Sequence, residues 1–226
     1  MRLLIIAAAA GAVLLGWVLL QRPSPEWEIS AGAPLVVGSP LDPFSYDGTH
    51  VLPAEGELAL TVDAATASGR LQVRLRATGP APLRSLVGEL EGAEILIQAT
   101  ELEGRWIDLP VYGDSGRGGP ELPETEALIA GTGRFTVSLD GSPTAATFAG
   151  RFSVAAAVRR EDGSIGQGGL IYSPLLRDKT GFAAADRLEA TLVLTAPDAR
   201  GQETVVWHIV FTRVTIDARP AGTGSD

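Results

Sequence analysis

A few residues in this sequence could carry out chemistry. Ser115 lies in the run 113–116 (GDSG) and could act as a nucleophile if a histidine and a carboxylate activated it. The chain has two histidines, His50 and His208, and no cysteine. Carboxylates are frequent between residues 89 and 126. A pair of them could hydrolyse a glycosidic bond, and a cluster could hold calcium.

The tetrapeptide Gly113-Asp114-Ser115-Gly116 resembles the sequence around the nucleophilic serine of chymotrypsin-like proteases. That resemblance implies an upstream histidine as the base. His50 is the only upstream histidine, and it lacks the residues that surround the base in that family. About 65 residues separate it from Ser115, too few to place base and nucleophile on two successive barrels. Since glycine and proline favour turns, we interpret residues 113–126 as a loop.

The second histidine and the acidic residues also have simpler interpretations. Alternation places His208 on the strand face that carries Val206 and Val210, and no cysteine or third histidine could complete a transition-metal site. We therefore expect a hydrogen-bonded or surface histidine. The carboxylates lack the spacing of a calcium loop and predict a solvated acidic face. Hence no catalytic residue, metal ligand or cofactor site is predicted.

One long connection is a candidate for binding a partner. Residues 173–186 (SPLLRDKTGFAAAD) interrupt a series of predicted strands and contain apolar side chains beside charged ones. An apolar centre with a charged rim is typical of a protein interface. The predicted partner-binding residues are Leu175, Leu176, Arg177 and Phe182. In the alternative interpretation, the apolar side chains plug one end of the domain.

The elements around these residues have the period of β-strands. Residues 57–62 and 70–76 alternate apolar and polar side chains, which predicts a hairpin with one buried face. Further strands are predicted over 95–99, 106–111 and the stretches from 135 onward, with two long strands near 147–159 and 204–217. We predict an all-β domain, a single antiparallel β-sandwich or flattened barrel of about nine or ten strands, preceded by one N-terminal transmembrane helix.

The predicted helix is the apolar run Leu3–Leu20, eighteen residues without a charged side chain. At 1.5 Å per residue it would cover roughly 27 Å, close to the thickness of a hydrocarbon core. A cleaved signal peptide is the alternative. Cleavage requires small residues after the apolar run, whereas the small residues Ala7–Ala12 lie within it. We therefore favour an uncleaved anchor, with the rest of the chain outside the cytoplasm.

The composition limits the classes of partner that this chain could bind and indicates its source. The formal charge of −9 argues against nucleic acid, which requires a basic surface. Arginine greatly outnumbers the single Lys179, and asparagine is absent, which we interpret as a bacterial composition. The predicted organisation is a signal anchor over 1–22, a proline-rich tether over 23–53, a β-domain over 54–220 and a disordered tail over 221–226.

The predicted function follows from these features. We expect a single-pass protein of the inner membrane whose C-terminal domain lies in the periplasm and binds a membrane or envelope protein. The alternatives are, second, a lipocalin-like carrier of an apolar small molecule and, third, a hydrolase. A carrier would need a continuous apolar cavity and a hydrolase a cleft of convergent polar groups.

Overall fold

The computed structural model describes residues 26–38, 42–63, 69–76, 92–113, 124–160, 162–167, 170–171, 187–197 and 200–219. Within them the chain forms strands and turns, and no helix. Likewise, these ranges contain no helix long and apolar enough to cross a membrane. The predicted anchor over 3–20 lies outside the described residues, and so does the predicted tail over 221–226.

The strands are β1 (Glu26–Val37), β2 (Val51–Pro53), β3 (Glu55–Asp63), β4 (Gly69–Arg76), β5 (Glu94–Tyr112), β6 (Glu124–Leu139), β7 (Ser142–Ala156), β8 (Gly166–Gln167), β9 (Leu170–Ile171), β10 (Leu188–Pro197) and β11 (Glu203–Arg219). Eight of them follow one another in the order β1-β3-β4-β5-β6-β7-β10-β11, and β11 pairs with β1 to close the ring. Strand β2 extends the sheet beside β1, while β8 and β9 pair with each other. The all-β prediction is confirmed, and of its two forms the barrel is observed.

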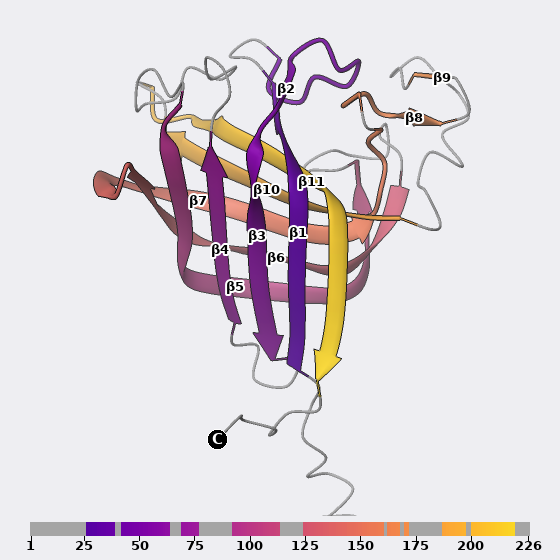
Figure 1. The fold of residues 1–226 in the computed structure, drawn as a ribbon, viewed down its shortest axis with the longest axis horizontal. Helices are drawn as coiled ribbons and strands as arrows, with labels where there is room; N and C mark the ends of the chain where they lie inside the picture. The colour runs from indigo at the N-terminus through magenta and orange to yellow at the C-terminus, as the bar shows by residue number, and fades with distance from the viewer. Residues whose placement is uncertain are drawn as a thin grey trace, which may run out of the picture.

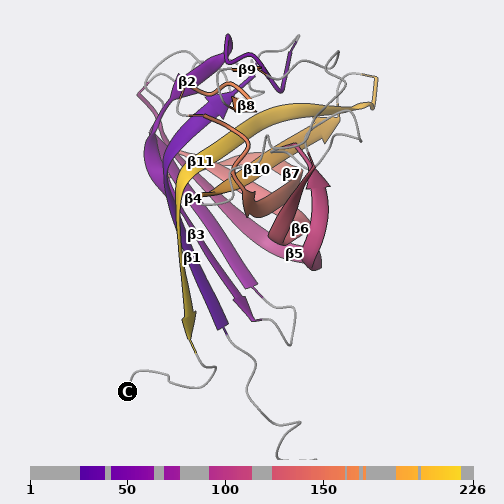
Figure 2. The same cartoon turned by 90° about the vertical axis from the view of Figure 1, so that its right-hand side faces the viewer.

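The barrel is flattened into two layers whose strands cross steeply (Figures 1 and 2). Strands β1, β3, β4 and the end of β11 form the front layer in Figure 1, and β6, β7 and β10 lie behind it. Strands β5 and β11 bend from one layer into the other. Strand β5 bends with register shifts at Ala99/Glu101 and at Glu103/Arg105. Such bulges let a strand turn a corner between orthogonal layers.

The second corner involves β1 and β11. Phe211 faces the core, and so do Val214 and Ile216 beyond it, so the alternation of side chains shifts by one residue between them. On the paired strand Ala33 has a φ of 53°, in the left-handed region, and its carbonyl accepts a hydrogen bond from the Thr212 hydroxyl at 3.3 Å. This local irregularity accommodates the bend of β11.

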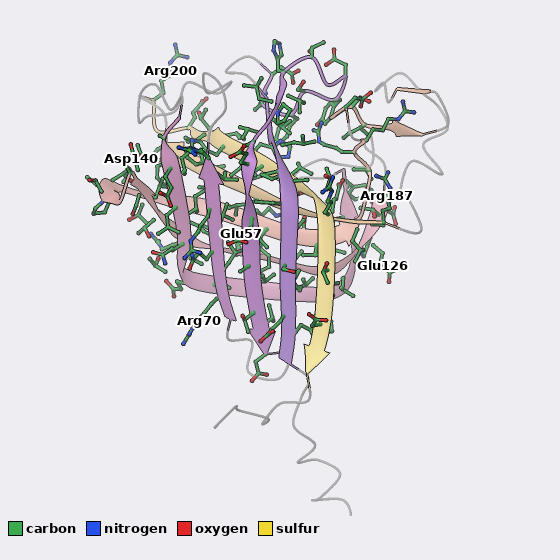
Figure 3. All side chains as sticks on the ribbon, viewed as in Figure 1. Glu57, Arg70, Glu126, Asp140, Arg187 and Arg200 are labelled. Atoms are coloured by element: carbon green, nitrogen blue, oxygen red, sulfur yellow. The ribbon has the colours of Figure 1, made fainter. Side chains whose placement is uncertain are left out.

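The inner faces of the eight strands form one apolar core. Leu58, Leu60 and Val62 of β3 lie inside, opposite the apolar residues of β4, so the predicted 57–62/70–76 hairpin is confirmed. The outer face of this front layer is charged. Glu57 and Arg70 project from it in Figure 3, and Glu57 forms an exposed ion pair of 3.7 Å with Arg74. The period of two therefore reflects a buried face and a solvated one.

The proline-rich tether predicted over 23–53 differs from the structure. Strand β1 occupies Glu26–Val37 and is paired on both sides, with β3 and with β11. The strand tolerates Pro34, which has no backbone N–H, next to the irregular residue Ala33. Strands β1 and β2, both within the range predicted as a tether, are therefore part of the sheet.

The two ends of the barrel have different roles. Glu26, the first residue of β1, pairs with Arg219, the last residue of β11, so the chain enters and leaves the barrel at the same end. In Figure 1 this is the lower end, and β2, β8 and β9 lie at the upper end. Residues 42–50 connect to β2 there. We refer to the two ends as the terminal end and the loop end.

Candidate functional site

The outer face of β10, and of β11 as far as Val210, is buried, unlike that of the front layer. Ala190, Leu192 and Leu194 of β10 face the core, yet Thr191 and Val193 between them are also only 2% and 1% exposed. A strand with both faces buried must be covered from outside. The hydrogen bonds of residues 42–50 and 157–165 show that these two segments contribute to the cover.

Arg159 fastens the two covering segments together. Its side chain is 1% exposed. One terminal nitrogen, Nη1, donates to the carbonyl oxygens of Ser45, at 3.1 Å, and Gly163, and the other, Nη2, donates to that of Phe44 at 2.5 Å. The backbone N–H of Arg159 donates to the Glu189 carboxylate on β10 at 3.0 Å. Because a guanidinium offers five donors in a fixed plane, one side chain can hold three carbonyls. We call this arrangement the Arg159 clamp.

His208 holds the same segment from β11. It is fully buried, and its Nδ1 lies 3.3 Å from the carbonyl oxygen of Pro43, which can only accept a hydrogen bond. Its ring also meets that of Phe44 edge-on, with centroids 5.5 Å apart. The carbonyls of three successive residues, Pro43, Phe44 and Ser45, therefore all meet a side-chain nitrogen of His208 or Arg159. His208 is a buried, hydrogen-bonded histidine, one of the two forms expected from the sequence.

Short polar turns fix the shape of the covering segments. The Asp47 carboxylate accepts hydrogen bonds from the Thr49 backbone and hydroxyl, at 2.9 and 2.7 Å. Asp162 does the same for Ser164, at 2.9 and 2.7 Å. These bonds stabilise the ionised forms, so the pKa of each carboxyl lies below its ordinary value. For Asp47 the backbone bond is the largest cause, and for Asp162 the bond from the Ser164 hydroxyl.

The two segments are also joined directly. The Ile165 N–H donates to the Tyr46 carbonyl at 2.8 Å. Gly48, with a φ of 78°, has so little space beside it that a Cβ would lie 3.0 Å from the Ser164 nitrogen. Gly163 has a φ of 83°, in the left-handed region that a tight turn at Asp162-Gly163 requires. Residues 42–50 are thus held in one conformation.

The clamped segment presents a small surface at the loop end. Asp47, Thr49 and His50 are exposed, while Phe44 and Tyr46 are half-buried, with their rings stacked at 6.1 Å between centroids. Aromatic edges beside polar groups on a fixed loop are common in protein-binding surfaces. We call residues 44–50 the loop-end surface. It contains no set of groups that would perform acid–base or nucleophilic chemistry.

The other residues singled out by sequence are placed as follows. His50 is exposed, and its backbone N–H donates to the Ser45 hydroxyl at 2.9 Å. Ser115 lies outside the described residues, as do the predicted partner-binding residues Leu175, Leu176, Arg177 and Phe182. The strand β9, which precedes that loop by sequence, lies at the loop end in Figure 1. The described residues hold no group of three His, Asp or Glu side chains that could bind a metal ion.

A polar groove of about 400 Å³ lies beside the ends of β3 and β4. Its charged lining residues are Glu55, Arg74, Arg76, Glu94 and Asp140. All five are exposed, and Asp140 accepts a hydrogen bond from the Glu94 backbone at 2.9 Å. Exposed charges of both signs are well solvated, so the groove has none of the desolvated groups that mark an active site.

Comparison with protein families, with characterised proteins and with solved structures finds no match to this chain.

Proposed function

We propose that this protein is a membrane-anchored binding or assembly module that presents the loop-end surface to a protein partner. The observation that carries the proposal is the position of the two ends: both termini of the barrel lie at one end, and the clamped segment lies at the other. A domain tethered by its N-terminus would therefore hold residues 44–50 away from its point of attachment.

The dimensions fit such an arrangement. The apolar run ends at Leu20, six residues before Glu26, so the link spans at most about 20 Å. Strand β1 has 12 residues and is about 40 Å long. An anchor in the inner membrane of a bacterium would then place the loop-end surface well into the periplasm, where a membrane or envelope protein could reach it. The loop 173–186, with Leu175, Leu176, Arg177 and Phe182, is proposed as part of the same contact.

The packing of the core favours a binding module over a carrier of apolar molecules. A ligand cavity would leave its lining side chains accessible to a water-sized sphere. The core residues Ile97, Ile129 and Phe135 are each 0% exposed, and the inward-facing side chains form one contiguous cluster. The barrel interior around them is filled in the way that a small eight-stranded barrel permits. A carrier would have to open this core.

Site-specific photo-crosslinking in native membranes tests the proposal. A photoreactive residue at Thr49 should give a discrete protein adduct, whereas one at Thr100, an exposed residue of β5, should not. Equal adducts from both positions would contradict a binding surface at the loop end. Saturable binding of a fluorescent fatty acid to the detergent-purified chain would instead favour the carrier.

The anchor is tested separately. Carbonate washing should leave the protein in the membrane fraction, and its intact mass should include residues 3–20. Recovery of a soluble form that begins after Arg22 would exclude the anchor, whatever the crosslinking shows.

A further inference from the structure

Strand β11 has an open edge near the terminal end. Its pairing with β10 ends at Phe211, whereas its pairing with β1 continues to Arg219. Among the described residues nothing pairs with the other edge of residues 213–217. In Figure 1 this stretch forms the right-hand border of the front layer. Its backbone N–H and C=O groups on that side are thus available to another strand.

This edge lacks the proline, lysine and register shifts that protect other strand edges. Among the other stretches without a second neighbour in the described strands are β5 beyond Gln98 and β7 before Ala149. Both contain register shifts, and β7 also carries Pro143. Bulges and proline prevent regular pairing with a further strand. Residues 213–217 contain neither proline nor lysine, and their pairing with β1 is regular from Arg213 to Asp217.

The side chains of this edge complement a second copy of themselves. Arg213, Thr215 and Asp217 are exposed on the outer face, and Val214 and Ile216 are half-buried on the inner face. If two such edges pair in antiparallel fashion about a two-fold axis at Thr215, each Arg213 lies opposite an Asp217. Each Val214 then lies opposite an Ile216, and the two threonines face each other. Opposite charges and apolar pairs at directly opposed positions stabilise a sheet.

Neighbouring registers are less favourable. An axis at Ile216 places Arg213 opposite Arg219, and an axis at Arg213 or Asp217 places like charges directly opposite each other. An axis at Val214 places Asp217 opposite Phe211, whose edge is already occupied by β10. Like charges opposite each other destabilise a sheet. Of these registers, only the one centred on Thr215 gives each of the residues 213–217 a favourable residue opposite it.

We propose that residues 213–217 of β11 pair with the same residues of a second copy of this chain, so that the two front layers form one continuous sheet. The interface is isologous, as a two-fold axis requires. Because the two copies of β11 run antiparallel, their loop ends point in opposite directions. The inference depends on β11 alone and holds with or without the anchor.

Cysteine crosslinking of the full-length chain tests the contact, because the chain has no cysteine of its own. Directly opposed residues of an antiparallel pair have the Cα separation that a disulfide needs. Thr215→Cys should form a disulfide-linked dimer under mild oxidation. Thr204→Cys, also exposed and on the same strand but distant from the edge, should not. Absence of the Thr215→Cys crosslink, or equal crosslinking at both positions, would overturn the proposal.

Charge exchange tests the register. In the Thr215→Cys background, Arg213→Asp and Asp217→Arg each place two like-charge pairs across the interface and should reduce crosslinking about tenfold or more. The double variant restores opposite charges and should restore the crosslink. All these side chains are exposed, so unchanged melting of each variant serves as the control for folding. Crosslinking that survives the single substitutions, or is not recovered in the double variant, would refute this pairing.

Discussion

Removal of the Arg159 side chain should release residues 42–50 from the second covering segment. In Arg159→Leu the carbonyls of Phe44, Ser45 and Gly163 lose their donor. Each buried carbonyl left without a donor costs about 1–3 kcal/mol. Because a loosened loop can turn some of them toward water, we use the lower limit and expect a loss of about 3 kcal/mol or more in the free energy of unfolding. For a domain of this size that corresponds to a fall in melting temperature of at least about 6 °C.

Two variants make this measurement specific. Arg76→Leu removes an arginine that is exposed on β4 and should change the stability by about 0.5 kcal/mol at most. Arg159→Lys keeps the charge, but its three donors share one nitrogen and cannot reach all the carbonyls that Nη1 and Nη2 contact, so its stability should fall between wild type and Arg159→Leu. Limited proteolysis should cut Arg159→Leu within residues 42–50 before the barrel unfolds. If denaturant unfolding of Arg159→Leu lies within 1 kcal/mol of wild type, the clamp does not hold the loop end.

Three further predictions concern the core, the loop end and the connection before β10. Gly150→Ala should destabilise the domain by about 1–3 kcal/mol, because the added Cβ would lie 2.6 Å from the Phe135 ring. Gly32→Ala is the control: the nearest atom to its Cβ would be 4.0 Å away, so its melting temperature should be nearly unchanged. The lowered pKa values of Asp47 and Asp162 give stability that is complete above their ordinary pKa of 3.8 and is lost as the pH falls through the lower folded values. Proteolysis of the loop end should therefore accelerate only below about pH 3.8. The acceleration should be smaller in a variant carrying Asp47→Asn and Asp162→Asn. Replacement of Leu175, Leu176 and Phe182 by serine should cost several kcal/mol if these side chains plug the core. If they dock a partner, the triple variant should keep its melting temperature and lose the Thr49 adduct, and no change in either measurement would remove both interpretations.

The sequence predicts those parts of the fold in which local pattern and tertiary environment agree. The front layer has one buried and one solvent-exposed face, so apolar and polar residues alternate clearly over 57–62 and 70–76. Turns that need a left-handed backbone are also visible. Asp140 and Gly141 have φ values of 47° and 77°, the conformation that Asp-Gly favours in a two-residue hairpin.

Prediction fails where strands bend. Strand β5 has 19 residues, yet its sequence predicts separate strands over 95–99 and 106–111. Each register shift adds a residue and reverses the alternation, so one bent strand looks like two straight ones. The difference between the predicted tether over 23–53 and the observed strand β1 has a related cause. Pro34 argues against a central strand, and only the irregularity at Ala33 allows it in β1.

The Arg159 clamp could not be predicted from local sequence. Its carbonyl partners Phe44 and Ser45 are 115 and 114 residues away, and backbone carbonyls leave no mark on the sequence. One signal was available: β10 and β11 have apolar residues on both faces, including Val193 and Val210 on the outer one. A strand with two apolar faces must be covered by another part of the chain. This pattern predicts a cover but does not identify it.

The rigidity of the loop end bears on the kind of function this domain can have. The barrel core is filled, so little of its interior can adapt to a ligand, and the adaptable surface must lie outside it. At the loop end the three carbonyls held by Arg159 and the turns at Asp47 and Asp162 order residues 44–50 before any partner arrives. A surface ordered in advance does not lose conformational entropy on binding, which strengthens an interface of modest size. At the terminal end the open edge of β11 offers backbone hydrogen bonds at fixed positions. If it pairs as proposed, each assembly would present two loop-end surfaces that point in opposite directions, so that one assembly could join two partner molecules.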